Sequence, residues 1–249
     1  MAKVRSIFNV EGTLGEVTFV KGEDGYYART KGGVSKKRIL SDPAFARTRE
    51  NLMEFANAAT SGKMLRRSIV GLLNDAKDNR VTSRLTQVMA RVKNEDLISS
   101  RGERNVATGI LTVLGKAWLN GFNFNKRAIL DSVLQAAFSL NPVTGEVVIA
   151  DLAPIQQLEI PDGATHVELS SGFLNLDFAT GIKDLQVSNL VNLPIDATIS
   201  TVTLTPAGAP VGTGQSFYFL KVVFYQEINA VQYPLNNGAF NALQLIEVL

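Results

Sequence analysis

Side chains that commonly carry out catalysis are few and widely separated in this chain of 249 residues. The chain has no cysteine, and its only histidine is His166. A Ser-His-Asp relay would have to use this histidine. The residues from Ala164 to Glu168 alternate as in a strand, so we interpret His166 as a hydrogen-bonded strand residue. A zinc site without cysteine or a second histidine would need carboxylates alone, which is a disfavoured ligand set.

Two glycine patterns resemble phosphate-binding loops but lack the required spacing. In a phosphate loop ending at Gly62-Lys63, the first glycine would stand at position 57, which is Asn57, and Met64 replaces the serine or threonine. Gly12 and Gly15 do not open a helix after a strand, as a dinucleotide fingerprint requires. Neither pattern predicts a nucleotide cofactor.

The carboxylate pairs lie in predicted turns or at helix ends, where solvated carboxylates are common. A glycosidase needs two carboxylates across a bound sugar, and the pairs Asp75/Asp78 and Glu95/Asp96 have no such setting. The sequence therefore predicts a protein that is not an enzyme, with no cofactor, no metal and no small-molecule substrate.

Charge is divided unequally along the chain. Residues 1–127 contain 23 of the 25 Lys and Arg and 12 of the 23 Asp and Glu, which gives them a net charge of +11, whereas residues 128–249 carry −9. A basic and an acidic surface on one body attract copies of that body. A contact between the basic surface of one copy and the acidic surface of the next can repeat from copy to copy. The series of copies forms a ring if it closes on itself and a filament or tube if it does not.

The basic half, residues 1–125, reads as a β-hairpin followed by a helical cluster. Residues 13–31 predict the hairpin, with a turn at 22–25, and Lys36-Lys37-Arg38 follow in an expected loop. Ser41-Asp42-Pro43 is a helix start. Helical spacing then predicts an apolar stripe of Phe45, Leu52, Phe55 and Ala59 in the first helix, and further helices over 64–76 and 82–94.

The acidic half, residues 126–249, reads as an antiparallel β-sandwich of immunoglobulin-like or jelly-roll type, so the fold class is α+β. Strands are predicted at 166–170, 173–178, 183–187, 198–204, 216–228 and 240–248. Residues 217–225 are apolar on both faces of their strand. Because a sandwich strand normally has one polar face, we expect the second face to be covered by the helical domain or by another subunit.

We expect neither a secretory signal peptide nor a membrane-spanning helix. The first residues lack the apolar run of a secretory signal peptide, and no stretch is apolar enough to span a membrane. We expect cytoplasmic synthesis without a Sec signal, with a possible place in an extracellular or virion-like assembly after release.

Three segments carry a resemblance to a known family. They are Gly12-Thr-Leu-Gly15, Ala28-Arg-Thr-Lys-Gly-Gly-Val34 and Asp42-Pro-Ala-Phe-Ala-Arg-Thr-Arg-Glu-Asn51, and Gly163-Ala-Thr-His-Val167 agrees with them. In these segments the chain resembles a family of small proteins common in Bacteroidota for which no activity is established. The resemblance implies a bacterial or phage-related source and transfers no site residue.

These observations favour a structural protein that assembles with copies of itself into a filament, a tube or a phage-like shell or tail. The predicted subunit interface joins basic, acidic and aromatic side chains: Arg47, Arg49, Arg66, Arg67, Glu168, Asp177, Asp184, Phe217, Phe219, Phe224 and Tyr225.

Nucleic-acid binding by the basic half is the alternative. Its candidate residues are Lys36, Lys37, Arg38, Arg47, Arg49, Arg66, Arg67, Arg80 and Arg84, with Tyr26 and Tyr27 for base stacking. Acidic residues between these cations and the lack of a helix-turn-helix signature weigh against it.

Overall fold

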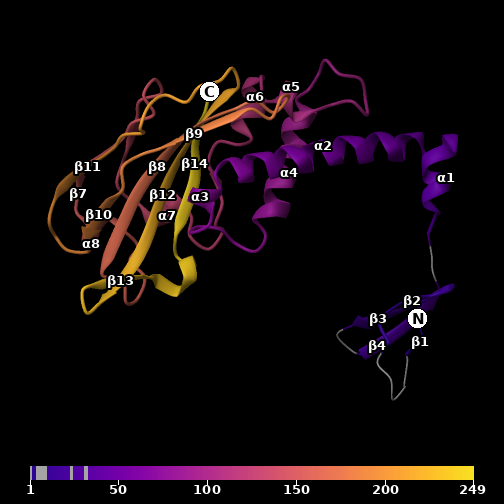
Figure 1. Ribbon diagram of the computed structural model, residues 1–249, viewed down its shortest axis with the longest axis horizontal. Helices are drawn as coiled ribbons and strands as arrows, with labels where there is room; N and C mark the ends of the chain where they lie inside the picture. Colours follow the sequence, from indigo (N-terminus) through magenta and orange to yellow (C-terminus); the bar gives the residue numbers. More distant parts are fainter. Residues whose placement is uncertain (1, 4–9, 23–24, 31–32) are drawn as a thin grey trace. The chain divides into compact units, whose positions relative to one another are not determined.

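The computed structural model in Figure 1 describes residues 2–3, 10–22, 25–30 and 33–249. The chain forms two compact units, residues 1–49 and 50–249. Helices and antiparallel sheets make up both, which confirms the α+β class. The predicted boundary at 125/126 differs from this division, because the helices that follow residue 50 share a hydrophobic core with the strands of the acidic half.

The described part of the first unit contains a four-stranded antiparallel sheet in the order β1-β4-β3-β2. Its strands are β1 (Ala2–Lys3), β2 (Gly12–Leu14), β3 (Val17–Gly22) and β4 (Gly25–Thr30). The predicted hairpin is β3–β4, although residues 23–24 of its turn lie outside the described residues.

A short helical segment follows the sheet. Helix α1 (Lys36–Ser41) replaces the loop expected there, because the Ser35 hydroxyl accepts a hydrogen bond from the backbone N–H of Arg38 and caps the first turn. The 3-10 helix η1 (Pro43–Phe45) begins at Pro43 and is capped by the Asp42 carboxylate, as the Ser-Asp-Pro pattern predicts.

Helix α2 (Ala46–Ser68) has its buried stripe on a different face from the one predicted. Glu54, Ala58, Gly62 and Leu65 are buried, whereas the predicted Leu52 and Phe55 are exposed. The inward face of α2 includes the small residues Ala58 and Gly62, and side chains of α4 (Val81–Asn94) lie at ordinary contact distance from Gly62. A Cβ at Gly62 would lie 3.6 Å from side-chain atoms of Leu85 and of Met89.

The other helices of the second unit are mostly short. They are α3 (Val70–Leu73), α4 (Val81–Asn94), α5 (Val106–Gly109), α6 (Val113–Ala117), α7 (Leu130–Val133) and α8 (Pro154–Gln157), with the 3-10 helix η2 (Leu235–Gly238). In α4, Leu85, Met89 and Val92 are buried at the predicted helical spacing, and Val81 joins them.

Two antiparallel sheets complete the second unit, whose backbone is described throughout. The larger sheet has the order β10-β8-β12-β14-β5, with β9 paired to β8 and β13 paired to β12. Its strands are β5 (Phe122–Asn123), β8 (His166–Leu176), β9 (Lys183–Val187), β10 (Val191–Pro194), β12 (Gln215–Ile228), β13 (Val231–Pro234) and β14 (Ala242–Val248). The smaller sheet contains β6 (Ser139–Leu140), β7 (Val147–Leu152) and β11 (Ser200–Leu204).

Strand β12 contributes to two separate hydrophobic clusters. Phe217 and Phe219 pack in the cluster that contains the buried residues of α2, α3 and α4. Leu220, Val222 and Phe224 pack with the smaller sheet. Figure 1 shows β8, β12 and β14 between β7 and β11 on one side and α3 and α4 on the other. The second apolar face is therefore covered by helices of the same chain, the first of the two alternatives expected.

Candidate functional site

The predicted interface arginines have different surroundings in the structure. Arg49 donates hydrogen bonds to the backbone carbonyls of Ile39 (2.8 Å) and Asp42 (2.9 Å), so it fixes the turn before α2. Arg47 is exposed in the first turn of α2. Arg66 and Arg67 lie in its last turn and line a surface hollow.

Two of the predicted interface acids accept hydrogen bonds from groups of their own chain. Asp177 accepts hydrogen bonds from the Thr180 hydroxyl (2.6 Å) and the backbone N–H of Ala179 (2.8 Å), and these bonds lower its pKa. Asp184 accepts from the Gln186 side chain (3.0 Å) and from the backbone N–H of Val211 (2.7 Å). Their charges are thus partly satisfied within the chain.

The predicted interface aromatics belong mainly to the core. Phe217, Phe219 and Phe224 are completely buried within the single chain, so they cannot contact a partner while the fold is intact. Tyr225 is half-buried, and burial raises the pKa of its hydroxyl, with the neighbouring Glu168 and Asp75 carboxylates raising it further. The predicted residues do not form one surface.

An apolar face of the first sheet is the feature that sequence reasoning missed. The register pairs Leu14 with Val17, Phe19 with Ala28, and Lys21 with Tyr26. Directly opposed residues lie on the same face of a sheet, so Leu14, Val17, Phe19, Tyr26 and Ala28 lie on one face, which we call the apolar sheet face, with Lys21 and Thr30 at its edge. Leu14 is 75% exposed, and the other four residues of the apolar sheet face are half-buried.

A second apolar surface lies beyond the end of α4. Leu97 and Ile98 are 83% and 88% exposed, although their loop is firmly held. The carboxylate of Asp96, itself buried, accepts hydrogen bonds from the backbone N–H groups of Ile98 (3.2 Å) and Asn105 (3.0 Å). Further exposed aliphatic residues lie between α5 and α6 and in α6, and with Leu97 and Ile98 they make up the set that we call the aliphatic patch: Leu97, Ile98, Leu111, Val113 and Leu114.

The cations predicted for nucleic-acid binding fall in two places. Lys36, Lys37, Arg38 and Arg47 belong to the first unit, whereas Arg66, Arg67, Arg80 and Arg84 belong to the second. Tyr26 and Tyr27 are adjacent in β4 and so point to opposite faces of the sheet. Arg84 is held in an ion pair with Asp78 at 2.5 Å.

His166 and Lys221 are two polar side chains of a kind that can carry out chemistry, and both have partners within the chain. His166 is a hydrogen-bonded strand residue, as predicted, with its Nδ1 3.0 Å from the Thr165 hydroxyl and its Nε2 3.5 Å from a Glu227 carboxylate oxygen. The buried Lys221, which sequence reasoning missed, donates to Asp75 at 3.0 Å. Among the described residues, no group of three His, Cys, Asp or Glu could hold a metal ion, and no helix could cross a membrane.

Comparison with protein-family models, curated proteins and solved structures found no match to this chain. The resemblance to a family common in Bacteroidota therefore stays a prediction.

Proposed function

We propose that the chain is a non-enzymatic structural subunit that assembles with copies of itself into a homopolymer. One observation carries the proposal. None of the described residues of the first unit, 10–22, 25–30 and 33–49, is buried, although four strands pair there and one face of the sheet is apolar. A sheet normally gains its stability by burying such a face against a second layer.

A second copy of the chain is the occupant that fits this face best. Two identical apolar sheet faces are complementary to each other, and sheets pack face to face at about 10 Å. A two-fold contact of this kind uses the same residues on both partners. Each copy then supplies a second layer to the other's apolar sheet face.

The aliphatic patch provides the second contact that a polymer needs. A subunit with a single two-fold contact stops at a dimer, whereas two different contacts continue the assembly unless the symmetry closes it. Exposed apolar surface of this kind is typical of interfaces between proteins.

The opposite net charges of the two halves have a smaller role in this proposal than the apolar faces. Asp177 accepts a hydrogen bond within its own turn, and Asp184 accepts one from the backbone N–H of Val211, so we assign the charges the role of steering encounters between subunits. We also retain, as part of the proposal, the description of the two sheets of the second unit as a β-sandwich of immunoglobulin-like or jelly-roll type. Their shared hydrophobic cluster supports the sandwich.

The test compares two lysine variants of β2 by sedimentation velocity at micromolar concentration. Leu14→Lys places a charge on the apolar sheet face, and Thr13→Lys places the same charge on the opposite face. Because an ammonium loses its water at an apolar contact without gaining a partner, we expect Leu14→Lys to raise the dissociation constant about tenfold or more. The Thr13→Lys protein should sediment like the unaltered chain.

Salt separates an apolar contact from a purely electrostatic one. The assembly should persist at about 1 M salt, where the screening length falls to about 3 Å. Sedimentation of the unaltered chain as a monomer at low and high salt would contradict the proposal, as would equal effects of the two lysine variants.

A further inference from the structure

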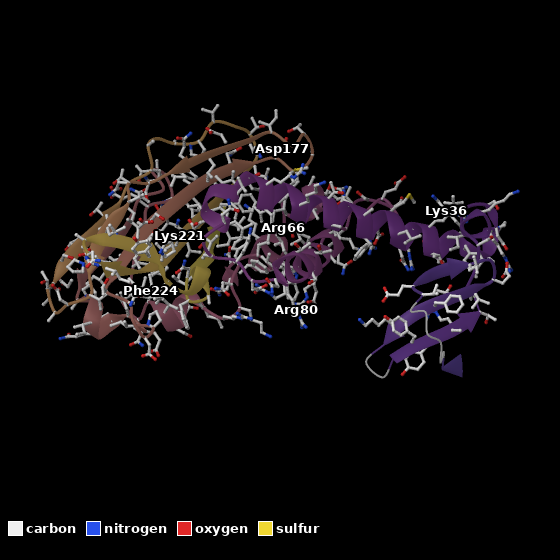
Figure 2. The ribbon with its side chains drawn as sticks, turned by 60° about the horizontal axis from the view of Figure 1, so that its bottom comes forward. Lys36, Arg66, Arg80, Asp177, Lys221 and Phe224 are labelled. Atoms are coloured by element: carbon white, nitrogen blue, oxygen red, sulfur yellow. The ribbon has the colours of Figure 1, made fainter. Side chains whose placement is uncertain are left out.

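A hollow of about 650 Å³ opens between three segments of the second unit that are distant in sequence. Its lining residues come from the α3–α4 turn, from the segment after β5 and from the end of η2: Lys77, Asp78, Asn79, Arg80, Asn125, Lys126, Arg127, Gly238 and Ala239. A neighbouring hollow of about 560 Å³ shares Lys77, Asp78 and Asn79 and reaches Arg66 and Arg67. Figure 2 shows Arg66 and Arg80 on the helical side of this unit. We call the two together the basic hollow.

The basic hollow has an uncompensated positive charge. Its carboxylates are Asp75, which pairs with Lys221 at 3.0 Å, and Asp78, which pairs with Arg84 at 2.5 Å. Neither partner lines the hollow. Within the described residues, no ion pair joins the six lining cations to a carboxylate: Arg66, Arg67, Lys77, Arg80, Lys126 and Arg127.

Hydrogen bonds hold the walls in place. The Asp78 carboxylate accepts hydrogen bonds from the backbone N–H groups of Arg80 (2.7 Å) and Lys126 (2.8 Å), so it joins two of the segments. The buried Asn125 amide donates to the carbonyls of Ala239 (3.1 Å) and Asn241 (2.9 Å), which joins the third. The site is thus formed before any ligand arrives, which reduces the entropy lost on binding.

Backbone geometry adds to the positive potential. Helix α4 begins at Val81, its N-terminus has no side-chain cap, and its first turn has no acidic residue. Val81 and Thr82 line the hollow, so the partial positive charge of this helix end adds to that of the cations.

We propose that the basic hollow binds the phosphate groups of a nucleic-acid strand. Six cations along two connected hollows suit a row of phosphates better than a single anion. No aromatic side chain lines either hollow, so stacking on bases is not available there. Recognition through phosphates alone predicts binding without sequence preference.

The experiment measures binding of fluorescent single- and double-stranded oligonucleotides by anisotropy over a range of salt concentrations. The double variant Arg80→Ala/Lys126→Ala removes two exposed cations of the hollow. Its matched control, Lys36→Ala/Lys37→Ala, removes two exposed cations of α1. We expect the hollow variant to lose about tenfold in affinity and its salt slope to fall by about two, with the control close to the unaltered chain.

Three results would overturn the proposal. The first is the absence of binding by the unaltered chain at low salt, and the second is an equal loss in both double variants. The third is a hollow variant that sediments as smaller species but binds oligonucleotides normally, since the hollow would then contact a second copy. Competition by inorganic pyrophosphate against oligonucleotide binding in the unaltered chain and in the α1 control, with weaker competition in the hollow variant, would place phosphate at the hollow and support the proposal.

Discussion

Glu54 and Lys93 are charged residues with little access to solvent, and they connect two segments of the second unit. The Glu54 carboxylate pairs with the Lys93 ammonium and accepts a hydrogen bond from the backbone N–H of Gly102 at 2.8 Å. These bonds hold the loop that carries Leu97 and Ile98 against α2. A buried pair of this kind is most sensitive to the loss of one partner.

Glu54→Ala should therefore lower the free energy of unfolding by about 3 kcal/mol, because it leaves the Lys93 ammonium poorly solvated and unpaired. Urea denaturation measures the change. Glu103→Ala, an exposed carboxylate in the same region, is the control and should change stability little. Equal stability of the two variants would show that the buried pair contributes nothing.

The lowered pKa of the buried Asp96 makes the stability of the fold depend on pH. Burial alone would raise its pKa, but hydrogen bonds from Ser99, Asn105 and Ile98 outweigh this effect and hold the pKa below its ordinary value. A carboxylate with a lowered pKa in the folded state stabilises the fold above the pKa of the unfolded chain, about 4. This contribution is lost as the pH falls through the lower, folded pKa.

We expect thermal stability to decrease as the pH falls below about 4. Asp78 and Glu54, whose pKa values are also lowered, contribute to the same decrease. In Asp96→Asn the decrease should be shallower, since the amide does not titrate. Scanning calorimetry of the unaltered chain and of Asp96→Asn over this pH range measures the decrease in thermal stability. Identical pH profiles of the two proteins would rule out a contribution from Asp96.

At the scale of elements, the sequence correctly predicted those helices and strands in which burial of apolar side chains alone determines the spacing of apolar residues. The β3–β4 hairpin, the stripe of α4 and the doubly buried β12 all follow from apolar spacing. The prediction was wrong for α2, because the inward face of that helix is made of small and polar residues such as Ala58 and Glu54. Close packing and a buried ion pair select that face, and neither is visible in an apolar pattern.

If the aliphatic patch is a contact between subunits, substitutions in the loop that carries Ile98 should change the length of the polymers. Ile98 is 88% exposed, so Ile98→Lys should leave the stability of the chain unchanged while it shortens the polymers. Ser100→Lys, a matched control in the same loop, should leave them intact. Electron microscopy of polymer length checks both, and long polymers of Ile98→Lys would exclude this patch as a contact.

At the scale of the whole molecule, the sequence predicted that the two halves of the chain differ in net charge. It did not predict which surfaces of the folded chain hold these charges. The basic hollow joins residues 66–67, 77–80, 125–127 and 238–239, and no local pattern connects segments so far apart. Asn125 and Gly238, which shape its walls, resemble ordinary loop residues in the sequence. The lack of buried residues at positions 10–22, 25–30 and 33–49 is likewise a property of three-dimensional packing, because these strands alternate as ordinary strands do.

Cryo-electron microscopy of the assembled protein tests most directly whether the first sheet obtains its second layer from another copy. We predict a reconstruction in which Leu14, Val17 and Phe19 are buried against the same residues of a neighbouring subunit. Single, separate chains at micromolar concentration, or an apolar sheet face that packs against residues 50–249 of its own chain, would contradict this prediction.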